Sequence, residues 1–221
     1  MLVARDRERL EQVAAELGRL TTTEVIVADL SVSADLERVA QRVAHSDVDL
    51  LVNNAGFGLN TPFLHGRSDA EHALIGVLVT AVMALTHAAL PGMVARGAGG
   101  VITVSSVAGW MASGTYSAAK AWATTFSESM YLQTRGTGVH VMALCPGFTR
   151  TEFHARADMA TATIPAWMWL DVDAVVAAAL RDLERRKPVS VPSARYRALA
   201  LVAQYLPRPL VRRISTVSRR R

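Results

Sequence analysis

The 221-residue sequence contains one cysteine, Cys145, and no N-terminal apolar run that resembles a signal peptide. A single cysteine excludes an internal disulfide framework, so nothing in the sequence points to an oxidising compartment. No apolar run is long enough for a clean transmembrane helix, and no internal repeat occurs. Because 51% of the residues are hydrophobic, we expect one cytoplasmic domain of the larger α/β kind with a substantial core.

Acidic side chains are absent after Glu184, whereas eleven of the 24 Arg and Lys residues follow it. We therefore distinguish a body, residues 1–192, from a basic and apolar C-terminal tail, residues 193–221. A segment with arginines among apolar residues can lie in a membrane interface, or it can pack on its own subunit or on a partner. No recognition motif accompanies the basic end, so nucleic acid is not an expected partner.

Tyr116 and Lys120 lie four residues apart in an apolar-periodic run that predicts a helix over Thr115–Tyr131. That spacing places both side chains on one helical face, one turn apart. An ammonium near a phenol lowers the pKa of the phenol, and such a tyrosine can exchange a proton with an alcohol or ketone. Taken alone the pair is a weak signal, because most such pairs lie on a solvated surface.

Three β-branched or apolar runs precede polar or glycine-containing turns, and each run predicts a buried strand. Val101–Ser106 ends in two serines, 49–52 leads into Asn53-Asn54-Ala55-Gly56, and 139–144 leads into Cys145-Pro146-Gly147. Residues at the carboxyl ends of parallel strands face the crevice in which open α/β sheets bind ligands. The strand that ends in the serines directly precedes the helix of Tyr116 and Lys120.

These motifs, in this order, resemble the short-chain dehydrogenase/reductase family over roughly residues 2–192. The resemblance implies a Rossmann-type doubly wound parallel sheet with helices on both faces, and a nicotinamide cofactor. It implies that Tyr116 is the general acid/base, that Lys120 lowers the tyrosine pKa and holds the nicotinamide ribose, and that Ser106 hydrogen-bonds the substrate oxygen. We choose Ser106 over Ser105 because Val107-Ala108-Gly109 follows it, and the short spacing to Tyr116 implies a trimmed loop.

The resemblance also implies which residues contact the cofactor. The expected cofactor-binding residues are Tyr116, Lys120, Asn53, Ala55, Gly56, Pro146, Gly147, Thr149 and Thr151. Asp29 and Leu30 are expected to contact the adenine. Arg5 follows the first predicted strand, where a cation contacts the 2′-phosphate of NADP and an acid favours NAD. Arg5 can also be a solvated cation at a helix start, and Asp6 follows it. We predict NADP, with NAD as the alternative, and no metal.

One expected part of the family pattern is missing. No G-x-x-x-G-x-G occurs, and Met1–Ala4 corresponds to the end of the second strand of the family. The first strand, the glycine-rich phosphate loop and the first helix are therefore lacking. Without that strand the sheet should contain a gap with unpaired backbone groups. We favour a longer chain starting upstream over a damaged or repurposed relative.

The long helix predicted over Ala70–Ala95 is apolar on much of its surface, and the resemblance implies a subunit interface and a homo-oligomer. By our alignment Leu78 occupies a position where the family often carries an asparagine of a proton relay. A variable lid over Glu152–Leu170 contains Phe153, Met159, Trp167 and Trp169. It suits an apolar substrate, or it packs on the core.

Two functions remain open. The first is an NAD(P)-dependent oxidoreductase that interconverts a carbonyl and an alcohol. The second is a catalytically impaired relative that binds a partner or an apolar ligand.

Overall fold

The computed structural model describes residues 1–153 and 164–217. The described strands are all parallel, namely β1 (Leu2–Ala4), β2 (Val25–Val27), β3 (Leu50–Asn53), β4 (Gly99–Val104), β5 (Val139–Leu144) and β6 (Val189–Ser190). The helices are α1 (Arg7–Leu17), α2 (Ser33–Ala44), α3 (Ser68–Ile75), α4 (Val82–Arg96), α5 (Gly114–Gln133), α7 (Val172–Glu184), α8 (Ala194–Tyr205) and α9 (Arg208–Val217). The predicted α/β fold of the Rossmann type is confirmed.

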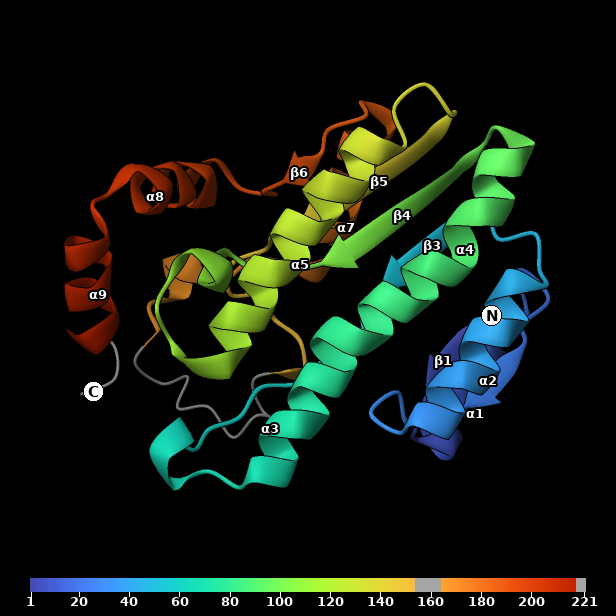
Figure 1. The fold of residues 1–221 in the computed structure, drawn as a ribbon, viewed down its shortest axis with the longest axis horizontal. Helices are drawn as coiled ribbons and strands as arrows, with labels where there is room; N and C mark the ends of the chain where they lie inside the picture. Colours follow the sequence, from blue (N-terminus) through green and yellow to red (C-terminus); the bar gives the residue numbers. More distant parts are fainter. Residues whose placement is uncertain (154–163, 218–221) are drawn as a thin grey trace.

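Alternate residues of the central strands pack on opposite faces of the sheet. Val101, Val139 and Val141 belong to a core with residues of α2 and α4. Ile102, Met142 and Leu144 belong to a second core with Val175 and Ala179 of α7. Because side chains alternate along a strand, α4 and α7 cover opposite faces, as a doubly wound sheet requires. Figure 1 shows α4 and α5 crossing the sheet on one side, with α7 behind it.

The strands form two separate sheets, as the missing strand predicted. β1 pairs only with β2, whereas the order in the other sheet is β3-β4-β5-β6. Leu50 and Val52 on β3 remain 40% and 49% exposed, although strands of a parallel sheet are usually buried on both faces. Among the described residues, β1 and β2 are joined to the body mainly through α2, which packs on α4. The gap in the sheet is therefore real, and it lies between β1–β2 and β3.

The predicted long helix is continuous from Ser68 to Arg96, and it includes a π-helical segment, η2 (Gly76–Ala81), between α3 and α4. By length and composition this one described helix is long and apolar enough to cross a membrane. The expectation that no run has that property was therefore wrong. Leu74, Leu78 and Met93 are nevertheless buried in the protein, which is how a core helix of this composition is used.

Candidate active site

Ser106, Tyr116 and Lys120 come together at the carboxyl end of β4. A 3₁₀ turn, η3 (Val107–Trp110), connects this end to α5, and the Ser106 hydroxyl accepts from the Ala108 N–H at 3.1 Å. The same hydroxyl lies close enough to the Tyr116 phenol to lower the pKa of that phenol. Lys120 follows one turn later on α5, with its Nζ 5.6 Å from the centre of the Tyr116 ring. The structure thus groups the three residues that the sequence nominated.

Ser105 has a different environment from Ser106. Its side chain is 2% exposed, and its Oγ donates to the Lys120 carbonyl at 2.7 Å and lies 2.7 Å from the Thr124 Oγ1. Gly109 allows η3 to pack directly on the backbone of α5, because a Cβ at this position would lie 2.9 Å from the Ala121 nitrogen. Ser105 therefore holds α5 against β4, while Ser106 faces the phenol, which supports the choice of Ser106.

The electrostatic expectation for this group was wrong. Burial raises the pKa of Tyr116 to about 12, and the Ser106 hydroxyl only partly opposes this. Burial lowers the pKa of Lys120 to about 8, and its Nζ donates to the Val104 carbonyl at 2.6 Å. In this arrangement the phenol keeps its proton at neutral pH, which is the form that can donate a proton to a carbonyl oxygen.

Leu78 lies directly beside this group. Its side chain is 2% exposed, and it packs in a cluster with Leu74, Ala119 and the partly buried Tyr116. A Cβ on Gly56 would lie 2.8 Å from the Leu78 Cδ2 and 3.9 Å from the Lys120 Nζ. The long helix Ser68–Arg96 therefore presents an apolar side chain near Lys120, at the position where the family often carries an asparagine.

The residues expected at the nicotinamide lie at the carboxyl ends of β3 and β5, the two strands on either side of β4. Ala55 and Gly56 are exposed after β3, and Pro146, Gly147 and Thr149 follow β5, partly buried. The Thr149 hydroxyl donates to the Gly147 carbonyl at 3.1 Å. Thr151 is exposed, and its hydroxyl accepts from the Phe153 N–H at 3.3 Å.

Asn53 is the exception among the residues at the strand ends. Its buried amide donates to the Thr86 hydroxyl of α4 at 3.1 Å. The structure therefore places this side chain between β3 and α4, where it ties the strand to the helix. It does not bring the Asn53 amide to Tyr116 and Lys120.

The residues expected at the adenine end lie on the separate strand pair. An Arg5 guanidinium nitrogen is 3.8 Å from the Asp29 Oδ2, while the Asp29 Oδ1 accepts hydrogen bonds from the Ser31 N–H and hydroxyl. The hydrogen bonds from Ser31 lower the pKa of Asp29, with a smaller contribution from Arg5. Leu30 is buried in the core instead of lying open to a ligand. Arg5 and Asp29 thus lie together at the carboxyl ends of β1 and β2. The helix α5 that carries Lys120 packs on the other sheet.

The described part of the lid is aromatic. Phe153 packs against Tyr116 with 5.8 Å between ring centres, Phe148 and Trp169 are also 5.8 Å apart, and Trp167 is 60% exposed. Met159 and the rest of 154–163 lie outside the described residues. Among the residues that are described, no group of His, Cys, Asp or Glu is arranged to hold a metal ion.

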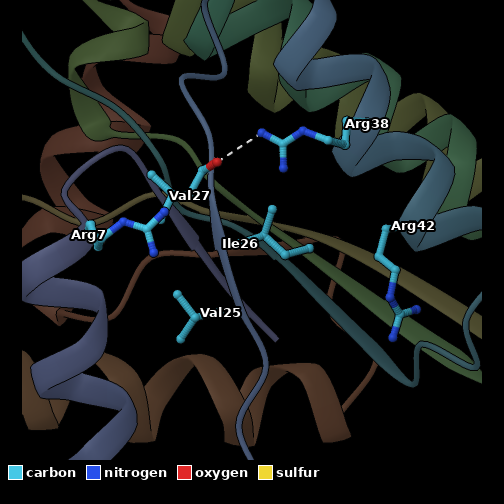
Figure 2. A pocket seen from close by; sticks show the side chains of 6 residues that line it. All are labelled: Arg7, Val25, Ile26, Val27, Arg38 and Arg42. Atoms are coloured by element: carbon cyan, nitrogen blue, oxygen red, sulfur yellow. Dashed lines mark hydrogen bonds between the residues drawn. The ribbon is translucent and has the colours of Figure 1, made fainter.

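A cavity of about 500 Å³ lies beside β2 and contains none of these residues. Figure 2 shows Arg7, Arg38 and Arg42 around Val25–Val27. Arg38 donates to the Val27 carbonyl at 2.9 Å, and Arg42 makes two hydrogen bonds to the Glu24 carboxylate, at 2.9 and 2.8 Å. These three arginines already have partners within the protein, since Arg7 also pairs with Glu11 at 3.5 Å.

One contact was not foreseen from the sequence. Tyr196, which lies in the basic and apolar tail, is 3% exposed and covers Gly147. Nothing in a tyrosine of a basic segment signals a partner 49 positions away. Only a three-dimensional structure reveals this contact.

The fold and the three grouped side chains define a Rossmann-type protein with a serine, tyrosine and lysine site. The family model described as short chain dehydrogenase matches residues 1–161, and the chain belongs to this family. A solved short-chain dehydrogenase from Sphingobium yanoikuyae in complex with NADPH is 33% identical, with a TM-score of 0.83 over 92% of this chain and 82% of that one.

Curated relatives are similar over shorter stretches. Sulfoacetaldehyde reductase 2 of Chromohalobacter salexigens is 32% identical over 160 residues, which are 69% of this chain and 64% of that protein. The human inactive hydroxysteroid dehydrogenase-like protein 1 is 29% identical over 166 residues, 72% of this chain and 50% of that protein. The chain thus spans between half and two thirds of the length of these relatives.

Proposed function

We propose that this protein is an NADP-dependent oxidoreductase that interconverts a carbonyl and an alcohol by hydride transfer. The observation that carries the proposal is the grouping of Ser106, Tyr116 and the buried Lys120, whose Nζ lies 5.6 Å from the centre of the Tyr116 ring. The NADPH bound to the Sphingobium neighbour supports NADP, with NAD as the alternative. We place the protein in the cytoplasm, as a homo-oligomer of the kind typical of its family.

The residues on the nicotinamide side fit such a cofactor. Gly56 after β3 has no side chain beside the Lys120 ammonium, and Gly147 and Thr149 follow the carboxyl end of β5. When bound, the nicotinamide supplies or accepts the hydride. Ser106 then hydrogen-bonds the substrate oxygen, Tyr116 gives that oxygen its phenolic proton, and Lys120 orients the ribose. Phe153 and Trp169 lie on the lid beside the site, which favours an apolar substrate.

The test is the substitution Tyr116→Phe in a chain that binds the cofactor. We would obtain such a chain by fusing a strand, a glycine-rich turn and a helix ahead of Met1. Turnover should fall by about 10²- to 10⁴-fold or more, because the phenol supplies the proton, while NADPH affinity should change little. Tyr131→Phe on the same helix is the matched control and should keep full turnover. Near-full activity of Tyr116→Phe would assign the proton to another group.

A second candidate function has its own support. The apolar Leu78 beside Lys120 favours a relative that binds a partner or an apolar ligand without turnover. The similarity to a human protein described as inactive is consistent with this. An active fused chain would exclude this alternative, and a fused chain that binds NADPH without turning over any carbonyl would favour it.

The tail adds a proposed peripheral contact with anionic membranes. Its two helices expose apolar side chains among arginines and carry no acid, and the exposed residues are Leu199, Leu201, Val202, Tyr205 and Leu210. Each arginine near an anionic surface contributes about 1 kcal/mol, and this contribution falls as salt is added.

Co-sedimentation with anionic vesicles tests the membrane contact. The full chain should pellet at low salt and be released at high salt, and zwitterionic vesicles are the control. Tyr205→Ser with Leu210→Ser should reduce pelleting, because both side chains are exposed and removable without opening the core. No pelleting at low salt would leave the tail as ordinary structure.

A further inference from the structure

We infer that Tyr196 of α8 is a positioning residue for the loop after β5, which the proposed function assigns to the nicotinamide and the lid. The first observation is the contact of its ring with Gly147. A Cβ built on Gly147 would lie 2.1 to 2.4 Å from three carbons of the Tyr196 ring. No side chain fits there, so the Tyr196 ring packs directly on the backbone of the loop and limits where the loop can lie.

The second observation is that the Tyr196 hydroxyl bridges the loop after β5 and the C-terminal part of the lid. It accepts from the Phe148 N–H at 3.2 Å and donates to the Met168 carbonyl at 2.8 Å. One phenol thus connects two stretches of chain that lie 20 residues apart in the sequence. A buried hydroxyl with both roles satisfied is a specific link, because loss of either partner leaves a buried polar group unpaired.

Two backbone hydrogen bonds connect the same parts of the chain. The Leu170 N–H donates to the Phe148 carbonyl at 2.7 Å, and the Arg150 N–H donates to the Leu170 carbonyl at 3.0 Å. The neighbouring Arg195 donates to the Trp169 carbonyl at 3.0 Å. Backbone hydrogen bonds therefore join residues 148–150 to Leu170, and α8 contacts the same two stretches of chain through Tyr196 and Arg195.

The consequence links the tail to the site. α8 also packs against η3, which follows Ser106, and the Val107 N–H donates to the Pro146 carbonyl at 3.1 Å. The helix therefore contacts the loops after β4 and β5, the two that carry Ser106, Gly147 and Thr149. The geometry of the substrate side depends on the C-terminal helix through Tyr196, although no residue of that helix is part of the Ser106, Tyr116 and Lys120 group.

Amide hydrogen exchange on the full chain tests this positioning role. Tyr196→Phe keeps the ring and removes both hydrogen bonds, so the Phe148 amide should exchange about 5- to 30-fold faster while the amides of β4 remain unchanged. The matched control is Tyr205→Phe on the same helix, where the phenol is 83% exposed and should have no effect. An unchanged Phe148 amide, or an equal rise throughout β4 and β5, would overturn the inference.

A double-mutant cycle tests the ring contact separately. Gly147→Ala should shift the unfolding equilibrium strongly in the native background and at least about tenfold less in a Tyr196→Ala background, where the Cβ has room. Equal shifts in the two backgrounds would contradict the contact.

The functional consequence is measured in the fused chain described above. Tyr196→Phe should raise KM for NADPH or for the carbonyl substrate by about 5- to 30-fold and change kcat little, because the proton donor is untouched. A fall in kcat with unchanged KM would contradict a positioning role. If the fused chain has no turnover even with native Tyr196, the proposed function fails, and hydrogen exchange decides the contact on its own.

Discussion

The strand pair β1–β2 and the sheet β3–β6 differ in how they are held. Residues of β1 and β2 are all partly exposed, whereas every residue of β5 is buried. Each strand of the pair is three residues long and has one partner, while β4 and β5 each pair on both edges. In the described chain the pair depends on the packing of α2 on α4, and the larger sheet has cores on both of its faces.

The same division separates the parts of the proposed site. Ser106, Tyr116 and Lys120 belong to the larger sheet and its helix α5, where hydrogen bonds from Ser105 to the Lys120 carbonyl and from the Lys120 Nζ to the Val104 carbonyl tie α5 to β4. Arg5 and Asp29 belong to the strand pair, with no strand between them and the rest. Local stability follows buried contacts and paired backbone, so the reactive side is preorganised, whereas the adenine side depends on a weakly connected unit.

The largest expected difference between the two regions is in hydrogen exchange of the native protein. Amides of β1 and β2 should exchange on the order of 10²- to 10³-fold faster than those of β4 and β5, because the strand pair can open without disrupting either core. The measurement is mass-spectrometric or NMR exchange on residues 1–221. Equal protection of the two sheets would show that they open as one unit and would remove the distinction.

In the region of the larger sheet, burial of the Lys120 charge affects the stability of the fold. Its folded pKa of about 8 lies below its ordinary value of 10.5, so the buried charge costs about 3 kcal/mol below pH 8. Between pH 8 and 10.5 the unfolded state binds more protons, and stability rises with pH. Lys120→Met should therefore raise the free energy of unfolding by about 1–3 kcal/mol at pH 7, and this gain should vanish towards pH 10.5.

Urea unfolding at the two pH values measures this effect. Lys187→Met is the control, because Lys187 is 44% exposed in its side chain and pairs with Asp182 at 2.6 Å. That change should give no stabilisation at either pH. A Lys120→Met variant that is destabilised at pH 7 would mean that the hydrogen bond to Val104 outweighs the cost of burying the charge.

Sequence reasoning located most elements because hydrophobic period and turn chemistry are local. The strand over 139–144 and the helix containing Tyr116 and Lys120 follow from such patterns, and the gap in the sheet follows from the missing motif. The direction of the Asn53 amide, the raised pKa of Tyr116 and the contact of Tyr196 with Gly147 depend on neighbours distant in the sequence. No local pattern encodes those neighbours, so these features required the structure.

The central claim is that residues 1–221 hold a preorganised reactive group whose cofactor site is divided by the gap in the sheet. Fluorescence titration with NADPH tests it most directly. The account predicts no saturable binding of residues 1–221 below roughly 1 mM, about −4 kcal/mol, and much tighter binding once a strand, glycine-rich turn and helix are fused ahead of Met1. Micromolar affinity of residues 1–221 alone would contradict it.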